Sequence, residues 1–295
     1  HQMKIIQTEN LSKYYGKARG IIDMNLSVEG GDIFGFIGPN GAGKSTTIRT
    51  LLGLISPTSG SARIFDKDIL KDHIEILSRI GYMPSEAMFY HGMRVEEVLR
   101  LSASLHGKNC RDEAHRLCER FKLDTKKKVE ELSLGNRKKV SIVCAFMHQP
   151  DLYILDEPTS GLDPLMQKAF FELIHEKNKQ GATIFLSSHV LSEIQHHCKN
   201  AAIIREGRLI ACDSVEKLTD TKARRVTLHG ISSPPRLDNT KNISCTENSV
   251  SFLYDGDIKV LIAELNQLPV TDMTVTEPEL EEIFLHYYTK EADVL

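Results

Sequence analysis

The apolar and polar positions of this chain follow one pattern up to about residue 220 and another beyond it. Residues 32–38, 151–157 and 182–188 are continuous apolar runs that end in polar residues. Such runs are typical of strands that a largely parallel sheet buries on both faces. Residues 94–123 carry apolar positions at three- and four-residue spacing, which predicts a helical insertion. Because a parallel sheet binds its ligand at the carboxyl ends of its strands, we expect the chemistry there.

The pattern after residue 220 predicts a second, smaller domain. The length of 295 residues fits one large domain, expected at 3–220 with a helical subdomain at about 85–145, and a small α/β domain at 221–295. A pair of prolines and several turn formers predict a loop at 230–242. Short strands are expected at 224–230, 242–254 and 273–277, and helices at 257–268 and 277–288.

The composition narrows the choice of partners and compartment. The chain has 37 Lys+Arg and 40 Asp+Glu, and the resulting net charge of -3 gives no reason to expect a nucleic-acid partner. The basic clusters at 126–128 and 137–139 predict solvent-exposed faces. The six cysteines form no C-x-x-C pair, which predicts reduced thiols in a cytosolic protein. Since no run approaches the roughly 18 apolar residues that a membrane span needs, we expect a soluble chain inside the cell.

The segment GPNGAGKSTT lies between a strand-like run and a helix-like run. Gly38, Gly41 and Gly43 let the backbone bend so that successive N–H groups point into one concavity, to which the following helix adds its positive end. Lys44 brings a mobile positive charge to the outer phosphates, and Ser45 presents a hydroxyl to Mg²⁺. The spacing G-x-x-x-x-G-K-[ST] therefore predicts a phosphate-binding loop.

Two adjacent carboxylates end the apolar run LYILDEP. A buried strand end is a costly place for two charges unless a metal ion or a substrate requires them. We therefore expect Asp156 to interact with Mg²⁺ and its water ligands, and Glu157 to interact with the attacking water. The only N-K-x segment that could read guanine, at 178–181, lacks the necessary aspartate, which disfavours a GTPase.

These motifs resemble, in order and spacing, those of the ATP-binding cassette (ABC) ATPases, in particular the cytoplasmic subunits of bacterial export-type ABC transporters. GPNGAGKST resembles the Walker A motif, LYILDEP the Walker B strand, and SGLD at 160–163 the D-loop, while LSSH ends in His189, which matches the switch histidine. The resemblance covers nearly the whole chain from about residue 4. It implies an α/β fold with a P-loop NTPase (RecA-like) core, antiparallel β and α-helical subdomains, and a small C-terminal accessory domain.

The resemblance also implies ATP and Mg²⁺ as ligands and assigns roles to residues. His189 would lie beside the γ-phosphate, where an imidazole can hydrogen-bond near the attacking water. Tyr15, or its neighbour Tyr14 in place of it, would stack on adenine. The implied ATP-binding residues are Tyr15, Gly38, Pro39, Asn40, Gly41, Ala42, Gly43, Lys44, Ser45, Thr46, Ser133 and Gly135, the Mg²⁺ ligands are Ser45 and Asp156, and the catalytic residues are Lys44, Glu157 and His189.

Two segments depart from the family pattern. In LSLGN at 132–136, where the family usually has L-S-G-G-Q, Ser133 and Gly135 remain and suit the γ-phosphate of ATP held by a second subunit. In GYMPSE, Ser85 stands where family members often have a glutamine that helps to bind Mg²⁺ and to signal to the membrane partner. Either Ser85 or Glu86 could replace that glutamine, and the sequence leaves this choice open.

The resemblance implies a subunit that hydrolyses ATP and powers export through a separate integral membrane permease, at the cytoplasmic face of the membrane. Two such subunits, identical or different, would pair head to tail, with each ATP clasped between residues 38–46 of one and 133–135 of the other. Segment 277–288 resembles the closing helix of an accessory domain of export-type cassettes. Two alternatives stay open: a soluble ABC-type ATPase and a weakly hydrolysing regulatory module. Lipid, peptide, antibiotic and polysaccharide cargo all fit.

Overall fold

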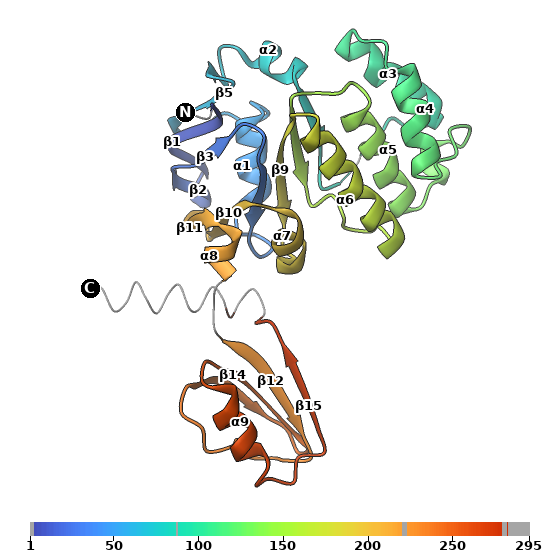
Figure 1. Ribbon diagram of the computed structural model, residues 1–295. Helices are drawn as coiled ribbons and strands as arrows, with labels where there is room; N and C mark the ends of the chain where they lie inside the picture. The colour runs from blue at the N-terminus through green and yellow to red at the C-terminus, as the bar shows by residue number, and fades with distance from the viewer. Residues whose placement is uncertain (1–2, 87, 220–222, 279–281, 283–295) are drawn as a thin grey trace. The chain divides into compact units, whose positions relative to one another are not determined.

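The computed structural model describes residues 3–86, 88–219, 223–278 and 282. The chain divides into two compact units, residues 1–215 and 216–295, whereas the sequence pattern predicted a division after residue 220 (Figure 1). None of the helices in the described part of the chain has the length and apolar character that crossing a membrane requires. All six cysteines carry free thiols.

A mainly parallel sheet forms the centre of the first unit. Within the described residues its strand order is β11-β10-β4-β9-β8-β7, and β11 alone among these strands runs antiparallel to its neighbour. The three predicted buried strands are confirmed as β4, β9 and β8, adjacent in this sheet. The bounds are β4 Ile33–Ile37, β7 Ile80–Met83, β8 Leu152–Asp156, β9 Thr183–Ser188, β10 Asn200–Arg205 and β11 Arg208–Ser214.

An antiparallel sheet and three helices accompany the central sheet. The antiparallel sheet has the strand order β2-β1-β5-β6, and β3 pairs with β1. The strand bounds are β1 Lys4–Tyr15, β2 Ala18–Met24, β3 Ser27–Glu29, β5 Ser59–Ile64 and β6 Lys67–Asp68. The helix bounds are α1 Lys44–Leu51, which follows β4, α2 His73–Ser78, which precedes β7, and α7 Leu191–His197, which follows β9.

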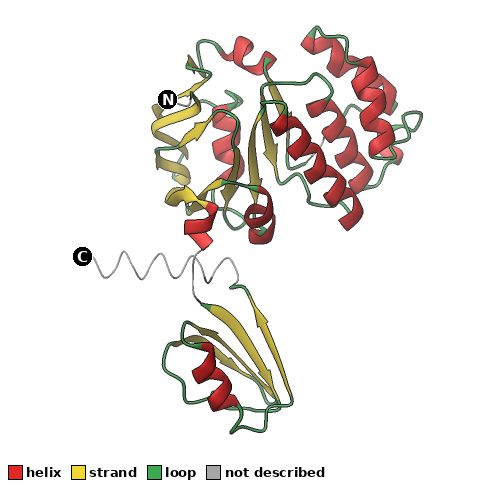
Figure 2. Cartoon of the chain, viewed as in Figure 1, coloured by secondary structure: helices red, strands yellow, loops and turns green. Residues whose placement is uncertain are grey.

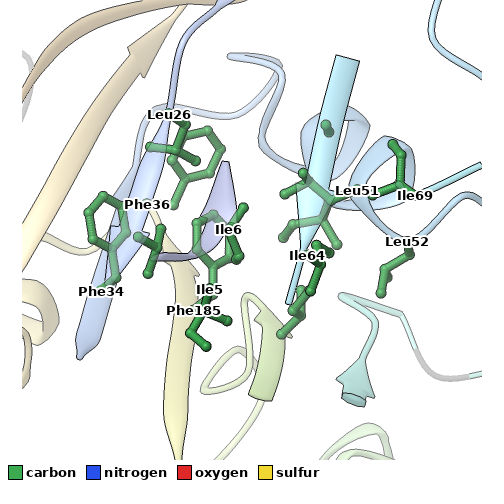
Figure 3. Packing of buried hydrophobic residues seen from close by; sticks show 14 of the residues in the cluster. Ile5, Ile6, Leu26, Phe34, Phe36, Leu51, Leu52, Ile64, Ile69 and Phe185 are labelled. Atoms are coloured by element: carbon green, nitrogen blue, oxygen red, sulfur yellow. The ribbon is translucent and has the colours of Figure 1, made fainter. Parts of the chain in front are cut away.

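The main core of this unit lies between the antiparallel sheet and one face of the central sheet. Figure 3 shows Phe36 of β4 and Phe185 of β9 close to Ile6 of β1, and Leu51 of α1 belongs to the same cluster. All four side chains are at most 1 % exposed. Burying each such side chain contributes about 1.5–3 kcal/mol, so this cluster holds α1 firmly between the two sheets.

The opposite face of the central sheet packs against helices α5 and α6 (Figures 1 and 2). Successive residues of a strand point to opposite faces, so Tyr153 of β8 faces these helices while its neighbour Ile154 belongs to the core that includes α1. The Tyr153 ring stacks on Phe146 of α5 with 4.3 Å between centroids, and Phe146 meets Phe170 of α6 edge to face. The bounds are α5 Leu134–Phe146 and α6 Pro164–Lys179.

The predicted helical insertion at 94–123 is confirmed, as two helices rather than one. α3 (Val95–His106) ends because Gly107 adopts a left-handed backbone with φ 61°, and α4 (Arg111–Arg120) follows. Ion pairs join α4 to α6, where Lys177 Nζ lies 2.7 Å from Glu113 and a guanidinium nitrogen of Arg120 lies 2.7 Å from Glu176. A short 3-10 helix at Val129–Glu131 leads into α5.

The second unit is a small α/β fold with its own core. Its antiparallel sheet has the order β13-β14-β12-β15, and α9 supplies Leu261 to a cluster with Val226, Leu228 and Phe252. The strands predicted in this region and the first of its two helices are confirmed. The second predicted helix, at 277–288, lies outside the described residues apart from 277, 278 and 282. The bounds are α8 Val215–Thr219, β12 Arg224–His229, β13 Thr240–Cys245, β14 Ser249–Tyr254, α9 Ile258–Leu265 and β15 Asp272–Thr276.

One expectation from the charge pattern is wrong. The basic cluster at 137–139 was expected on a solvent-exposed face, yet Lys138 is 2 % exposed and Arg137 and Lys139 are half-buried. The physical reason is the position of α5, which packs between the sheet and α3. One side of the helix turn that carries these basic residues therefore lies against protein. By contrast, Lys126 and Lys128 are exposed, as predicted.

A buried imidazole makes the stability of the first unit sensitive to pH. His148 is 3 % exposed, its Nε2 lies 3.0 Å from the carbonyl oxygen of Ile80, and its ring stacks on His106. Burial, together with the nearby charge of His106 when protonated, lowers the pKa of His148 to about 4. In the unfolded chain the same ring titrates near its ordinary value of about 6.5.

We predict that the free energy of unfolding falls as the pH drops from about 7 to about 5, because the unfolded chain then binds a proton at His148 that the folded chain excludes. His148→Gln keeps an N–H donor for Ile80 but does not titrate, so its stability should depend less steeply on pH. Urea unfolding at several pH values measures this slope. His115→Gln, at an exposed position of α4, should keep the wild-type slope, and an equal slope for both variants would contradict the prediction.

Candidate active site

The segment between β4 and α1 forms a backbone cradle. Gly43, at the N-cap of α1, has φ 108°, a conformation that a side chain would strain, and it turns the chain directly into the helix. No side chain caps this end of α1, so the first N–H groups of the helix point into the loop without a partner from a cap residue. Such an end attracts anions, and phosphate is the anion that this geometry suits.

Lys44 folds back over this cradle. Its Nζ donates to the carbonyl oxygen of Gly38 at 2.6 Å and to that of Pro39 at 3.1 Å, and the side chain is 6 % exposed. The ammonium also lies 3.1 Å from Oε1 of Glu157, an ion pair whose angle does not make a hydrogen bond. The lysine therefore links the loop after β4 to the carboxylate after β8.

Asp156 and Glu157 stand at the carboxyl end of β8. Asp156 is 1 % exposed, and its Oδ1 accepts a hydrogen bond of 2.6 Å from the hydroxyl of Ser187 on β9. The backbone N–H of Glu157 donates to the same hydroxyl oxygen at 3.1 Å. Asp156 shares a strand face with Ile154, which packs in the cluster that contains α1, so its carboxylate lies on the side of the sheet where α1 begins with Lys44 and Ser45.

His189 contacts Glu157 at the carboxyl ends of β8 and β9. It follows β9 directly, is 47 % exposed, and its Nδ1 lies 2.7 Å from Oε2 of Glu157. Glu157 itself has φ 49°, a left-handed backbone that is uncommon for a residue with a side chain. The two oxygens of this carboxylate thus face Lys44 on one side and His189 on the other.

Glu193 of α7 fastens the chain segments that carry these groups. Its Oε1 accepts a hydrogen bond of 2.6 Å from Thr159, which follows Glu157, and its Oε2 accepts one of 2.7 Å from Ser188, which precedes His189. The bridge holds the segment after β8 against the segment after β9. Ser187 and Glu193 were not predicted from the sequence, although Ser187 lies within LSSH, where a hydroxyl so close to His189 was a usable signal.

Tyr15 lies near the phosphate cradle. Its ring is half-exposed, with Lys13 Nζ 5.5 Å from the ring centroid. Gly20 separates it from the loop, because a Cβ placed at Gly20 would meet both the Tyr15 ring at 3.1 Å and the Thr46 methyl group at 3.0 Å. An exposed aromatic face so close to Thr46 suits a planar base, and its role in binding stays a prediction.

Ser133 and Gly135 lie apart from this cluster, at the start of α5. Ser133 caps the helix, with its hydroxyl oxygen accepting from the N–H of Asn136 at 3.3 Å. Gly135 packs so closely on the loop after β8 that an added Cβ would lie 2.8 Å from the carbonyl oxygen of Gly161. Among the described residues, no hydrogen bond joins Ser133 or Gly135 to the cradle of the same chain.

The described residues contain no group of three or more His, Cys, Asp or Glu side chains arranged for a metal ion. Magnesium takes few protein ligands, prefers hard oxygens and completes its shell with water and substrate phosphates. The Asp156 carboxylate and the Ser45 hydroxyl are donors of that kind, on the same side of the sheet. These two residues fit Mg²⁺ bound together with a nucleotide.

Together, a phosphate cradle before α1, a lysine over it and paired carboxylates on an adjacent parallel strand define a P-loop nucleoside triphosphatase. The comparisons with known proteins specify the family. A family model described as ABC transporter matches residues 21–160. Bacitracin transport ATP-binding protein BcrA of Bacillus licheniformis is 45% identical over 210 residues, which is 70% of this chain and 68% of that protein. The chain therefore belongs to the ABC transporter ATP-binding proteins.

Two further comparisons extend this result. Linearmycin resistance ATP-binding protein LnrL of Bacillus subtilis is 29% identical over 303 residues, which is 96% of this chain and 97% of that protein. A solved structure, the ATP-binding subunit of an ABC transporter, has a TM-score of 0.69 at 32% identity and covers 72% of this chain and 91% of that one. The resemblance stated from the sequence motifs, and the fold that it implied, are thereby confirmed.

The two hydrogen bonds of the Ser187 hydroxyl predict a contribution of this residue to the free energy of unfolding. We expect Ser187→Ala to lower the free energy of unfolding by about 1–3 kcal/mol, because it leaves the buried Asp156 carboxylate without this donor. Urea unfolding measures the loss. Ser160→Ala, at an exposed position of the neighbouring loop, should change stability by less than about 0.5 kcal/mol. Equal effects of the two substitutions would show that the Ser187 hydroxyl contributes nothing specific.

Proposed function

We propose that this chain hydrolyses ATP and powers export through a separate membrane permease. The observation that carries the proposal is the position of Glu157 between Lys44 and His189, at 3.1 and 2.7 Å, beside an anion cradle. In this arrangement a carboxylate able to accept a proton from water lies next to the place where a terminal phosphate would bind. An anion-binding protein without catalysis would need the cradle alone.

The order of events follows from the present partners of Lys44. Its ammonium is held by two loop carbonyl oxygens and by Glu157. An incoming phosphate carries more negative charge than these groups, so Lys44 turns toward it and Glu157 is released from the ion pair. The freed carboxylate then orients a water molecule and takes up one of its protons as the water oxygen attacks the γ-phosphorus in line. The bond between the γ-phosphorus and the oxygen that bridges it to the β-phosphate breaks, so that ADP and phosphate leave, while His189 keeps Glu157 in place.

Mg²⁺, held by Ser45 and Asp156, would neutralise charge on the phosphates during this step. The positive end of α1 and Lys44 stabilise the charge that develops in the transition state. Tyr15 would carry the adenine ring, and residues 38–46 the phosphates. All of these groups belong to one chain, and all except Tyr15, which ends β1 of the antiparallel sheet, lie at the ends of strands of the central sheet or on segments that follow them.

The location of Ser133 and Gly135 supports a sandwich of two subunits. Ser133 is exposed at the N-terminus of a 13-residue helix, and its helix dipole and hydroxyl suit a phosphate. Since it has no hydrogen bond to the cradle of its own chain among the described residues, a second subunit paired head to tail would present its ATP there. The partner can be a second copy or a related cassette, because the proposal requires only a cradle opposite Ser133.

Exposed apolar side chains support a membrane partner. Met88 and Tyr90, in the segment after β7, are 90% and 74% exposed, and Leu105 of α3 is 80% exposed. Apolar groups of this size in water favour a protein interface, and we assign it to the permease. The chain would then act at the cytoplasmic face of the membrane. A soluble ABC-type ATPase would leave this surface without a partner, and a weakly hydrolysing regulatory module would not need Glu157 beside the cradle.

The names of two relatives favour one class of cargo. BcrA is named for bacitracin transport and LnrL for linearmycin resistance, and the match to LnrL spans almost the full length of both chains. We therefore favour export of an antibiotic, peptide antibiotics included, over the lipid and polysaccharide cargo that the sequence also allowed.

Glu157→Gln tests the proposal directly. We expect ATP hydrolysis to fall by about 100-fold or more, because the amide cannot accept the proton of the attacking water. ATP binding should persist, so that Mg²⁺ and ATP convert the variant into a stable dimer, measured by light scattering. Adding Lys44→Ala should abolish this dimer. Glu119→Gln, at an exposed position of α4, is the control and should hydrolyse ATP as the wild type does.

Two outcomes would contradict parts of the proposal. Wild-type hydrolysis that Glu157→Gln leaves unchanged would remove Glu157 from catalysis. An ATP-binding variant that stays monomeric would exclude a sandwich of two copies and direct the search to a different partner cassette. Copurification of the wild-type chain with an integral membrane protein would separate the transporter from a soluble ABC-type ATPase.

A further inference from the structure

A buried lysine connects α5 with the loop after β7. Lys138 is 2 % exposed, and its Nζ donates a hydrogen bond of 2.6 Å to the backbone carbonyl oxygen of Ser85. Its two neighbours in the sequence, Arg137 and Lys139, are half-buried. The lysine therefore lies on the inner side of the helix, and its ammonium reaches a segment more than 50 residues away in the chain.

Burial of this ammonium is costly and must be balanced. An ammonium group has three donors, and among the described residues Lys138 uses one hydrogen bond and has no carboxylate within 4.0 Å. Burial accordingly lowers the pKa of Lys138, and three carboxylates oppose this effect in the order Asp156, Glu157, Glu86. Two of these three belong to the proposed catalytic site.

Another buried lysine has a carboxylate partner in direct contact, as expected of a lysine whose role is structural. Lys177 of α6 is 3 % exposed, and its Nζ lies 2.7 Å from the carboxylate of Glu113, which neutralises it directly. Lys138 has no such partner at hand among the described residues. The loop that it holds leaves the sheet beside the strand that carries Asp156, so its position bears on the proposed site as well as on packing.

The surroundings of Lys138 connect three parts of the site. Ser85 follows β7, which pairs in parallel with β8, so the loop after β7 leaves the sheet next to the end of the strand that carries Asp156. Lys138 is also one helical turn beyond Gly135, which packs on Gly161. A displacement of the loop after β7 would thus be passed through Lys138 to the beginning of α5.

We propose that Lys138 is a positioning residue for ATP hydrolysis, which ties Ser85 to α5 and keeps a positive charge near the strand end that carries Asp156 and Glu157. This inference rests on the proposed function for its effect on catalysis. The hydrogen bond from Lys138 to Ser85, called the tie here, orders the loop after β7. The positive charge of Lys138 stabilises the two adjacent carboxylates. The two parts can be separated by substitution.

Three substitutions at residue 138 separate the tie from the charge. Lys138→Met removes both, Lys138→Gln keeps a donor of shorter reach without charge, and Lys138→Arg keeps both. We expect kcat for ATP to fall by about tenfold in Lys138→Met while KM changes by less than about twofold, because the residue does not touch ATP. Lys138→Gln should fall between, and Lys138→Arg should recover most of the wild-type kcat. Lys139→Met, on the same helix, is the matched control.

A second measurement does not depend on hydrolysis. Hydrogen exchange of the backbone amides of Met83, Ser85 and Glu86 in the nucleotide-free protein should be about tenfold faster in Lys138→Met than in the wild type and unchanged in Lys139→Met. The midpoint of thermal unfolding, measured in parallel, shows whether each variant is folded. If Lys138→Met does not fold, Lys138→Gln, which keeps a polar group at this position, replaces it in both measurements.

The outcomes distinguish this inference from the proposed function. A wild-type chain that does not hydrolyse ATP would overturn the proposed function, while the exchange rates would still test the tie. A wild type that hydrolyses ATP, with Lys138→Met equal to it in kcat and exchange, would overturn the role of Lys138. The role would also fail if Lys138→Arg were as inactive as Lys138→Met with a higher KM and a lower unfolding midpoint, since that result describes a packing residue.

Discussion

The site depends on one carboxylate that is mostly buried at the end of a strand. Glu157 is 15 % exposed, and a carboxylate withdrawn from water to this extent needs positive charge or hydrogen-bond donors close by. Lys44, in the segment after β4, and His189, directly after β9, supply these groups to Glu157. The Ser187 hydroxyl accepts a hydrogen bond from the backbone N–H of Glu157 and so holds this residue in place. The parallel order of β4, β9 and β8 is what brings these three ends together.

The alternation of residues along β8 decides which chemistry reaches the ligand. Tyr153 points to the helices on one face and Ile154 to the core around α1 on the other, so Asp156 falls on the same side as α1 and its Ser45. A shift of one residue in the register of β8 would turn the carboxylate toward Phe146 and α5, away from Ser45 and the start of α1. The apolar packing on both faces of the sheet therefore protects the geometry of the charges as well as the stability of the fold.

The sequence predicted the parts of the structure whose signals are local. Buried parallel strands are continuous apolar runs, and the phosphate loop is a spacing of glycines and one lysine, so both were found with no knowledge of tertiary contacts. A glycine that ends a helix is also a local signal, so the break between α3 and α4 at Gly107 was predictable, whereas the role of Ser187 depends on what packs nearby. The burial of Lys138 is the clearest failure, because a lysine between two basic residues looks exposed until the direction of α5 is known.

The contact between Gly135 and Gly161 gives the N-terminus of α5 a mechanical connection to the catalytic loop. Glu157, Thr159 and Gly161 lie on one short segment after β8, and Glu193 fixes the middle of that segment to α7. Because Gly135 leaves no space on Gly161, any movement of this segment on nucleotide binding must also displace α5 or open the contact. The same helix carries Ser133, which the proposed sandwich turns toward the ATP of a partner. Occupancy of one site would therefore alter the second, through a few tightly packed backbone atoms and without a long relay of side chains.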